Sequence, residues 1–513
     1  MPARDSRVPG APRSLTRRGF LQAAVGTTGL LLLTACGGAT APTTKPAEPA
    51  KPAEAPKPAE APKPAAASPA AAAAASPAAG ASPAASPAAS PAAGASPSPA
   101  AAAQAAPAAP RKPANLSGVT LSFLQWASFI PTADAFLKKQ IEEGFMKETG
   151  AVVTFEAINA NDIQPKTSAA IQSGTGPDVI SFRDNWAHTY KESMTDISDL
   201  VEELKRTQFG PFYPASEACT NVDGKYLAMP HDAGGGIIHW RKNWFAEAGA
   251  ATYPKTYADL HTVGKTLKDK GRPLGQAFGH SFGDPPGWCY SMMWGYGGQE
   301  VDANGKVAIN SPATIRAVTD MAQAFKDAYD DTGLAWDDGS NNRAFLAETI
   351  SSTLNGSSIW FVARQDKVPF FDDIGLDPVP AGPQTRAILP GLTNYVIPKY
   401  SKNVDAAKEL IRWLMRADTF TPRFLENQSY IGGISPKHDS EMPWSTFPAT
   451  VQVFKDIGTY ARTLGWPGPP SQKAGLAWSK YIVVDMFARA IQGDSPEAAV
   501  KWAEGELKGI YEV

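Results

Sequence analysis

The stretch at residues 223–249, DGKYLAMPHDAGGGIIHWRKNWFAEAG, predicts how the folded part of the chain is divided. A short apolar run ends at Pro230, and a second one, at 237–240, follows a bridge of polar residues and three glycines. Consecutive glycines give the backbone wide φ/ψ freedom, so two strands can meet there at an unusual angle. We therefore expect the chain to cross here between two lobes. The alternative is a glycine-rich β-bulge inside one sheet.

Strand and helix patterns alternate upstream of this crossover. We expect strands at 119–124, 152–157 and 179–182 and helices at 133–149 and 163–172. This order indicates an α/β fold with a parallel sheet and helices on both faces. Ligands of such sheets bind beyond the carboxyl ends of the strands. Trp126 and residues 183–186 follow two of the predicted strands and would lie there.

A second set of elements follows the crossover. Residues 257–270 have helical spacing, and Ser311 before Pro312 predicts a capped helix start. Residues 284–288, DPPGW, are expected to form a loop, and residues 390–397 a strand that crosses back. The chain is expected to close with helices at 405–415, 479–492 and 495–511.

Composition narrows the classes of function. The 513 residues carry a net charge of −2, which argues against a nucleic-acid binder because such proteins present a basic face. Surplus tryptophan often lines ligand clefts, although core packing uses many such residues, and this chain has 13. Cys219 and Cys289 flank the crossover, so we expect them to lie in different lobes and to stay unpaired.

The first 36 residues have the features of an export signal. Paired arginines at 17–18 precede an apolar segment, as in twin-arginine signals. The segment ends in LTAC at 33–36, which resembles the bacterial lipobox, whose cysteine is acylated and becomes the new N-terminus. A transmembrane helix is the alternative, and Gly26 and Gly29 argue against it. Residues 37–115, rich in Ala, Pro and Ser, are expected to form a disordered tether.

Several short motifs are informative as a set. They are SGTGPDV at 173–179, DGKY at 223–226 with Pro230, GGII at 235–238, KTYADL at 255–260, NG at 355–356 with Trp360, Gly391 before VIP at 396–398, and AAK at 406–408 with WL at 413–414. In this order they resemble the carbohydrate-binding, family 1 extracellular solute-binding proteins of ABC importers. The resemblance covers nearly all of the chain from residue 116 onward.

The resemblance implies a two-lobed, type II periplasmic-binding-protein fold over residues 116–513. The first lobe would hold about 116–230 plus 391–440, and the second about 231–390 plus 441–513. A solute would lie in the cleft between the lobes, and closure would report its capture to an ABC permease. We expect a monomer without cofactor, metal or catalytic residues. It would be held by a lipid on Cys36 at the outer face of a bacterial membrane.

The resemblance also implies a site. A sugar presents hydroxyls and a C–H face, so it needs flat aromatic rings and carboxylates or amides that accept hydrogen bonds. The expected ligand-binding residues are Trp126, Asp184, Trp186, His231, Asp232, Trp288, Trp360, Asn394 and Trp478. Core packing is the alternative for each tryptophan. We expect Asp184 and Asp232 to hold the solute from opposite sides of the cleft.

Alternatives stay open for the function. The same cleft would also suit a polyamine or a glycerophosphodiester. Residues 279–283, GHSFG, fit the G-x-S-x-G nucleophile elbow, and chain order permits a triad of Ser281, an aspartate and His438 in a secreted esterase. An elbow requires a helix directly after the serine, so the loop expected at 284–288 argues against this function.

Overall fold

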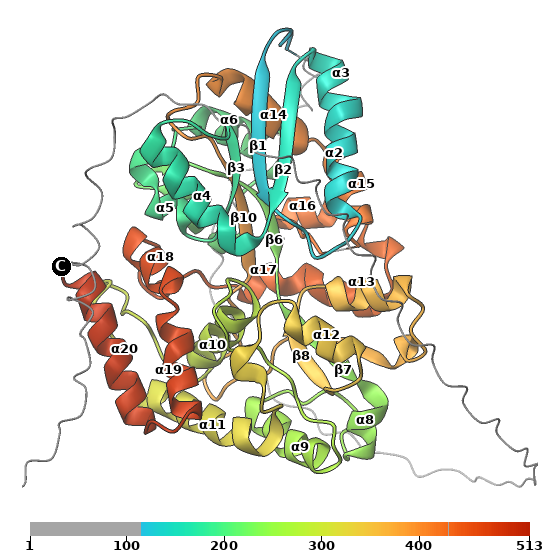
Figure 1. Ribbon diagram of the computed structural model, residues 1–513, viewed down its shortest axis with the longest axis vertical. Helices are drawn as coiled ribbons and strands as arrows, with labels where there is room; N and C mark the ends of the chain where they lie inside the picture. The colour runs from blue at the N-terminus through green and yellow to red at the C-terminus, as the bar shows by residue number, and fades with distance from the viewer. Residues whose placement is uncertain (1–113, 429) are drawn as a thin grey trace, which may run out of the picture. The chain divides into compact units, whose positions relative to one another are not determined.

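Two main sheets organise the part of the chain that the computed structural model describes, residues 114–428 and 430–513 (Figure 1). The first sheet contains β1 (Thr120–Trp126), β2 (Val152–Ile158), β3 (Val179–Arg183), β6 (Met229–Gly234) and β10 (Gly391–Val396). The second contains β7 (Ile237–Arg241), β8 (Ser352–Asn355) and β9 (Ile374–Asp377). We call the elements around the first sheet the first lobe and those around the second sheet the second lobe. The expected export signal, Cys36 and residues 37–113 lie outside the described residues.

The first sheet has the order β2-β1-β3-β10-β6. Strand β1 pairs in parallel with β2 and with β3, which confirms the parallel arrangement predicted for these strands. Strand β10 returns from the second lobe and pairs antiparallel with both β3 and β6, so the complete sheet is mixed. All five residues of β3 are buried, which is the pattern of a strand covered on both faces.

Helices connect and cover these strands (Figure 1). Those in the chain between β1 and β6 are α2 (Ala133–Gln140), η1 (Ile141–Phe145), α3 (Met146–Thr149), α4 (Ala160–Ser173), α5 (Trp186–Thr189), η2 (Lys191–Ser193), α6 (Ser198–Leu204), η3 (Lys205–Phe209) and α7 (Pro214–Thr220), followed by the small hairpin β4 (Asn221–Val222) and β5 (Lys225–Tyr226). The helix predicted at 133–149 is present as the continuous run α2–η1–α3. The predicted helix at 163–172 begins three residues earlier because the side chain of Asn159 caps α4.

The glycine-rich stretch crosses between the sheets, as predicted. Strand β6 ends at Gly234 in the first sheet, and β7 begins at Ile237 in the second. The alternative of a bulge inside one sheet is therefore wrong. Close packing explains the glycine at 236: its φ is not positive, and a Cβ there would lie 2.7 Å from Cγ of Leu354. The bridge is shorter than expected, because Asp232 still belongs to β6.

The second lobe surrounds the sheet β8-β7-β9. Its elements between β7 and β10 include α8 (Lys242–Glu247), α9 (Tyr257–Asp269), α10 (Asp284–Gly295), α11 (Pro312–Ala328), η4 (Gly333–Ala335), α12 (Ser340–Leu346), α13 (Ser358–Gln365) and η5 (Phe371–Asp373). Ser311 caps α11 as predicted. The loop predicted at 284–288 is wrong, because α10 begins at Asp284. Its prolines occupy the first turn, where a missing N–H removes no helical hydrogen bond.

The C-terminal part returns to both lobes. It contains α14 (Val404–Leu414), α15 (Ala417–Glu426), α16 (Pro436–Glu441), η6 (Trp444–Thr446), η7 (Ala449–Asp456), α17 (Ile457–Tyr460), α18 (Gln472–Ser479), α19 (Ile482–Ile491) and α20 (Pro496–Tyr511). Helix α18 packs on α5 of the first lobe, whereas α19 packs on α10 and α11 of the second. The strand predicted at 390–397 and the helices predicted at 405–415 and 495–511 are present, and the one at 479–492 begins later.

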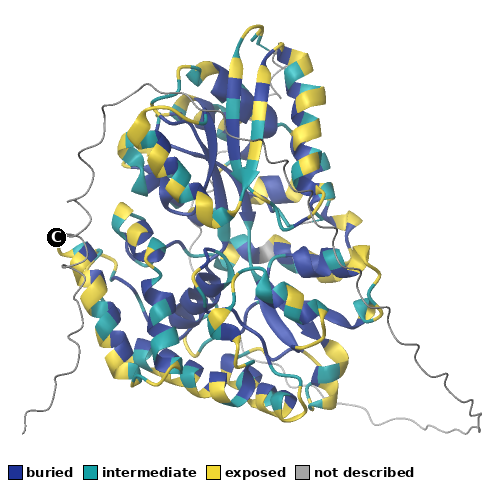
Figure 2. Cartoon of the chain, viewed as in Figure 1, coloured by how far each residue is buried: buried dark blue, intermediate teal, exposed yellow. Residues whose placement is uncertain are grey.

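Burial follows the sheets and the helix faces that contact them (Figure 2). Cys219 in α7 and Cys289 in α10 are both buried and unpaired, which confirms that prediction. Within the described residues, no helix combines the length and apolar character needed to cross a bilayer.

Candidate functional site

A cleft of about 690 Å³, counting its open mouth, lies where the chain passes between the sheets. The first lobe and both crossovers contribute Trp126, Phe129, Arg183, Asp184, Asp232, residues 234–236, residues 389–391 and Tyr430. The second lobe contributes residues 282–284, Gly287, Asp338 and residues 354–356. A solute in this cleft would contact both lobes.

Arg183 occupies the middle of the polar lining. It ends β3, and its guanidinium carbon lies 4.4 Å from the ring centroid of Trp126 at the end of β1. Its Nε lies 3.6 Å from Oδ2 of Asp184. Gly391 leaves room for this side chain, because a Cβ there would lie 2.9 Å from Nη2 of Arg183. The set predicted from the sequence omitted Arg183, although its place beside Asp184 at the end of a buried strand was the available signal.

Asp184 and Asp232 form the acidic part of the first-lobe wall. Oδ1 of Asp184 accepts a hydrogen bond from the Leu392 amide at 3.3 Å. Oδ1 of Asp232 accepts from the Gly432 amide at 2.7 Å, and its Oδ2 accepts from the Thr393 hydroxyl at 3.3 Å. Burial raises the pKa of Asp184 to about 6 and that of Asp232 to about 7.

The expectation that these two aspartates face each other across the cleft is wrong. Asp184 directly follows β3 and Asp232 lies in β6, and both strands pair with β10 in the first sheet. They therefore approach from the same wall. Asp184 also has a φ of 39°, a left-handed conformation that non-glycine residues adopt uncommonly and that clusters at functional sites.

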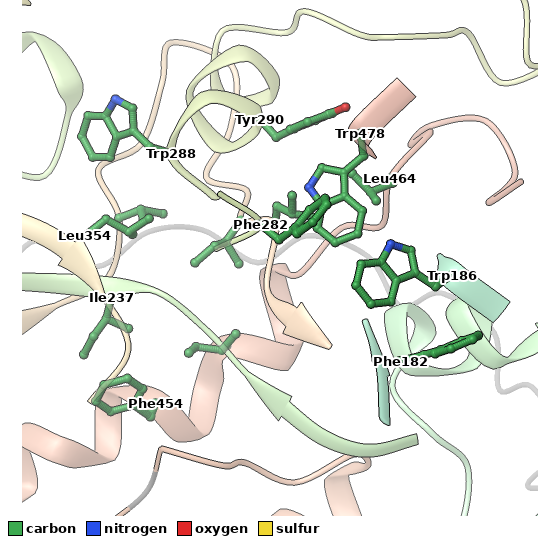
Figure 3. Close-up of a cluster of buried hydrophobic side chains, with 14 of the residues drawn as sticks. Phe182, Trp186, Ile237, Phe282, Trp288, Tyr290, Leu354, Phe454, Leu464 and Trp478 are labelled. Carbon is green, nitrogen blue, oxygen red and sulfur yellow. The ribbon is translucent and has the colours of Figure 1, made fainter. Parts of the chain in front are cut away.

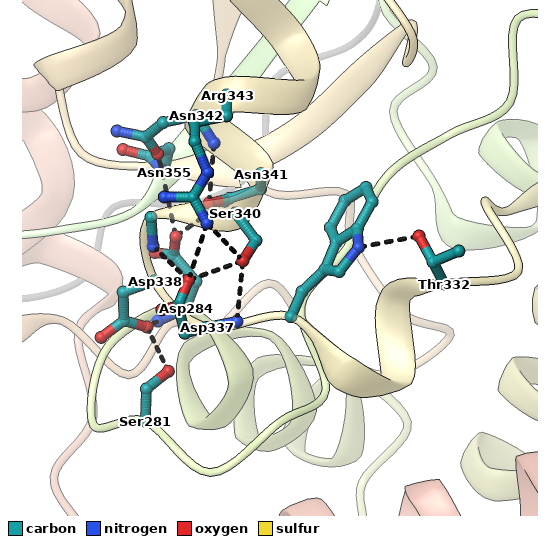
Figure 4. A network of polar contacts seen from close by, with 12 residues as sticks. Ser281, Asp284, Thr332, Asp337, Asp338, Ser340, Asn341, Asn342, Arg343 and Asn355 are labelled. Carbon is teal, nitrogen blue, oxygen red and sulfur yellow. Dashed lines mark hydrogen bonds and ion pairs between the residues drawn. The ribbon is translucent and has the colours of Figure 1, made fainter. Parts of the chain in front are cut away.

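The opposite wall carries a second pair of carboxylates, Asp284 and Asp338, within a polar network (Figure 4). Asp338 accepts hydrogen bonds from the Ser281 hydroxyl at 2.7 Å and from the amides of Gly283 and Asp284 at 3.0 and 2.8 Å. These bonds fix the start of α10 against the loop before α12. Oδ2 of Asp284 accepts from the side-chain amides of two residues, Asn341 at 2.7 Å and Asn355 at 3.0 Å.

The charge of Arg183 acts on carboxyl groups of both walls. Burial raises the pKa of all four carboxyl groups, and the positive charge of Arg183 opposes that rise in each of them. For Asp284 the charge of Asp338 adds to the rise, and its pKa lies well above the ordinary value. The cleft lining thus presents one cation, Arg183, among four carboxyl groups with raised pKa values. Such groups can both accept and donate hydrogen bonds.

Trp186 and Trp478 lie behind the cleft in a buried aromatic cluster (Figure 3). Their ring centroids are 5.8 Å apart, and Phe282, which does line the cleft, lies 5.5 Å from the first and 4.9 Å from the second. The cluster joins α5 of the first lobe, the loop before α10 of the second lobe, and α18. These two tryptophans therefore support the lining rather than form it.

The other predicted residues also lie outside the cleft lining. Trp288 donates its indole N–H to Sδ of Met321, and Trp360 packs on Phe371 at 5.5 Å. Asn394 donates from its side-chain amide to the backbone carbonyl of Asp184 at 3.3 Å, behind the wall. Of the nine predicted residues, the structure brings Trp126, Asp184 and Asp232 together at the cleft.

His231 lines a second cavity instead, which adjoins the cleft within the first lobe. Its ring stacks on Tyr395 with centroids 3.9 Å apart, and its Nε2 lies 3.2 Å from the Ser181 hydroxyl. Burial, together with the charge of Arg423, holds the pKa of His231 well below its ordinary value, so the ring is neutral.

The residues of the proposed esterase triad are not assembled. Helix α10 begins three residues after Ser281, which suits a nucleophile elbow. The Ser281 hydroxyl, however, donates its hydrogen bond to Asp338 and not to a histidine. His438 lies in the first lobe between Phe209 and Phe420, at centroid distances of 4.8 and 4.6 Å. Among residues 114–428 and 430–513, no three His, Cys, Asp or Glu side chains come together as a metal site.

Comparison with known proteins identifies relatives of this architecture. The family model described as bacterial extracellular solute-binding protein matches residues 140–456. A Deinococcus radiodurans protein named "Probable ABC transporter-binding protein" is 24% identical over 331 residues, which are 61% of this chain and 76% of that protein. The diacetylchitobiose binding protein DasA of Streptomyces coelicolor is 28% identical over 198 residues, or 36% of this chain and 43% of that protein.

A solved structure supports the fold. Maltose-bound MalE3 of T. maritima superposes with a TM-score of 0.65 at 20% identity, over 76% of this chain and all (100%) of that chain. The likeness confirms the expected two-lobed fold.

Proposed function

Because the chain belongs to the bacterial extracellular solute-binding protein family, we propose that it captures a saccharide in the cleft and delivers it to the membrane subunits of an ABC importer. The observation that carries this proposal is the composition of the cleft. Trp126 and Phe129 offer aromatic faces on one side, and carboxyl groups stand on both walls. This is the combination that a sugar's C–H face and hydroxyls require.

The walls suit a solute with many hydroxyl groups. Arg183 donates, the carboxyl groups accept, and their raised pKa values allow them to donate as well when protonated. Relatives of the chain fit this class: DasA is a diacetylchitobiose binding protein, and the MalE3 structure holds maltose.

The crossovers connect capture to transport. Residues 234–236 and 389–391 line the cleft and also join the two lobes. A solute bonded to Asp232 on one wall and Asp284 on the other gains most when the lobes are closed, so binding favours the closed state. Closure would present the loaded protein to its permease without any chemical change in the solute.

We further propose that the mature protein is anchored by a lipid on Cys36 and acts as a monomer on the outer face of the membrane. The support is the arginine pair and the lipobox-like LTAC sequence. One acyl chain gives only marginal membrane binding, and two or more anchor stably.

A ligand screen tests the saccharide assignment. The full chain is screened by thermal shift against maltose, diacetylchitobiose and a panel of other saccharides, with spermidine and glycerophosphocholine as solutes of other classes. Isothermal titration calorimetry then measures the hits. Asp232→Ala on one wall and Asp284→Asn on the other should each weaken binding about two- to tenfold, since a hydrogen bond between neutral groups contributes about 0.5–1.5 kcal/mol.

Asp366→Asn is the matched control, because Asp366 is exposed on the surface. It should leave affinity unchanged. Binding of spermidine with no saccharide bound would replace the proposal with the polyamine alternative, for which the four carboxyl groups in the cleft are the favouring observation.

A further inference from the structure

The second cavity, of about 470 Å³ counting its mouth, lies inside the first lobe beside the cleft. Trp126, Asp232 and Tyr430 line both spaces. A solute held in the cleft would therefore have part of its surface next to the cavity. The cavity lining mixes apolar and polar residues, with His231 and Arg423 among the polar ones.

Arg423, from α15, is buried in the wall of this cavity with only 5% of its surface exposed. Its Nη1 donates to the Tyr395 hydroxyl at 3.0 Å. Its Nε and Nη2 have no hydrogen-bond partner. Arginine is almost never fully buried unless it is paired, and within the described part of the chain Arg423 forms no ion pair. A buried guanidinium with two free donors needs an acceptor from elsewhere.

The carboxylates that line the cavity are already used by other donors. Asp134 accepts from Gln125 at 3.1 Å and from the Ser128 amide at 2.9 Å. Asp232 accepts from the Gly432 amide and from Thr393. The neutral His231 contributes no charge. Arg423 is therefore the one positive charge among the cavity's described lining residues, and it acts on the Asp232 carboxyl group without forming an ion pair with it.

The free atoms of Arg423 have the geometry that a carboxylate fits. Nε and Nη2 lie on one edge of the guanidinium and carry two parallel N–H bonds, the fork that binds a carboxylate with both oxygens. Both atoms are buried, so a small shift of the side chain must expose them to the cavity. The remaining nitrogen is fixed by Tyr395, which is itself held by stacking on His231. The guanidinium is thus held by its neighbours in the protein interior, where a charge-assisted bond is stronger than in bulk water.

We propose that the second cavity is a subsite for the carboxylate of an acidic saccharide, such as a uronate, which Arg423 binds through Nε and Nη2 while the rest of the sugar lies in the cleft. This inference rests on the proposed saccharide function. It narrows the solute from sugars in general to sugars that carry an acidic group. Asp232 stands between the two spaces, and its raised pKa reduces its repulsion of a bound anion.

Matched sugar pairs test the subsite on the wild-type full chain. Calorimetry compares D-glucuronate with D-glucose, and D-galacturonate with D-galactose, at constant ionic strength. The expected result is at least a tenfold preference for the uronate of each pair. Equal affinities within a pair, or tighter binding of the neutral sugar, would overturn the subsite while leaving the saccharide function standing. Failure of every saccharide to bind would overturn both.

Variants of Arg423 test the residue. Arg423→Lys keeps the charge but loses the fork and should lose most of the uronate preference. Arg423→Gln should abolish the preference and leave affinity for the neutral sugar within about twofold. Arg364→Gln is the control, because Arg364 is an exposed arginine that donates to Gln428 and does not line the cavity. Thermal melts followed by circular dichroism establish whether each variant folds. If a variant does not fold, the comparison of uronate and neutral sugar on the wild type decides whether the subsite exists.

A neutral sugar group in the second cavity would give a different result with Arg423→Gln. If Arg423→Gln weakens diacetylchitobiose and leaves both uronates unaffected, the occupant is an amide carbonyl, and the carboxylate proposal is wrong.

Discussion

The guanidinium of Arg183 covers one face of the Trp126 ring, with its carbon 4.4 Å from the ring centroid. The two residues end neighbouring parallel strands, β3 and β1, so the stack lies at the carboxyl edge of the first sheet. A cation over an aromatic face stabilises the ring in one orientation. Trp126 is therefore held in place before a solute arrives, which lowers the entropy lost on binding.

Removing this ring should weaken binding. Trp126→Ala is expected to reduce saccharide affinity at least tenfold, equivalent to about 1.4 kcal/mol, because the stacking surface is lost. The saccharide affinity of Trp126→Phe should lie between that of Trp126→Ala and that of the wild type. Calorimetry with a saccharide from the screen measures both. Trp502→Ala is the control, since Arg489 covers its ring in a similar stack at 5.0 Å outside the cleft. Equal losses in Trp126→Ala and Trp502→Ala would show that the effect is not local to the cleft.

The contribution of Asp184 and Asp232 to stability should fall as the pH rises from about 4 to 8. In the unfolded chain an aspartate has a pKa of about 3.9, whereas burial raises the pKa of Asp184 to about 6 and that of Asp232 to about 7. The folded state therefore holds protons that the unfolded state has released. The stabilisation is complete below the unfolded pKa and is lost as the pH passes the folded values.

Urea unfolding of the unliganded chain across this pH range measures the effect. The stability of the wild type relative to Asp232→Asn should fall with pH, because the amide does not titrate, whereas the difference between the wild type and Asp366→Asn should not change with pH. A difference between the wild type and Asp232→Asn that is constant or rises between pH 5 and 8 would contradict the prediction.

Gly391→Ala should impair binding through Arg183. The new Cβ would lie 2.9 Å from Nη2 of Arg183, so the guanidinium must shift from its present position over Trp126. We expect a loss of saccharide affinity of several-fold to tenfold together with a lower melting temperature. Gly505→Ala is the control: it lies in α20 with nothing within 4 Å of the new Cβ. It should stabilise the helix by up to about 1 kcal/mol. Unchanged affinity in Gly391→Ala would show that Arg183 does not depend on this space.

Cys36→Ala should release the protein from the membrane or leave it unprocessed. The expected cause is loss of the thiol that would be acylated in the LTAC sequence. Fractionation of expressing cells followed by mass spectrometry of the N-terminus measures both outcomes. Recovery of the wild-type protein only in the soluble fraction, with residues before Cys36 intact, would contradict the anchor.

The sequence predicts the fold well where local patterns decide the outcome. The first three strands and the crossing at 234–237 follow from apolar periodicity and from the glycines. The start of α10 does not, because Pro285 and Pro286 read as a loop unless the capping contact of Asp338 is known. That contact joins residues 54 positions apart, and local sequence carries no signal for it.

The site is predicted less completely for a related reason. Trp126 and Trp186 both follow strands of the same sheet, yet one lines the cleft and the other is buried against Trp478. Residue type and position at a strand end do not distinguish them, since the difference depends on how the two lobes meet. Asp284 and Asp338 are absent from the expected set, because their mutual contact joins residues 54 positions apart and local sequence carries no signal for it.

The contact of α18 with α5 gives the two lobes a link in addition to the crossover strands. If Trp186 and Trp478 stay packed while the cleft opens, their cluster acts as a pivot. In a rigid rotation each point travels in proportion to its distance from the axis. The rim of the cleft farthest from the cluster then moves through the largest arc, whereas Phe282, which touches both tryptophans, hardly moves. A solute would enter at the side of the cleft farthest from the aromatic cluster and contact Phe282, which hardly moves, at the opposite side.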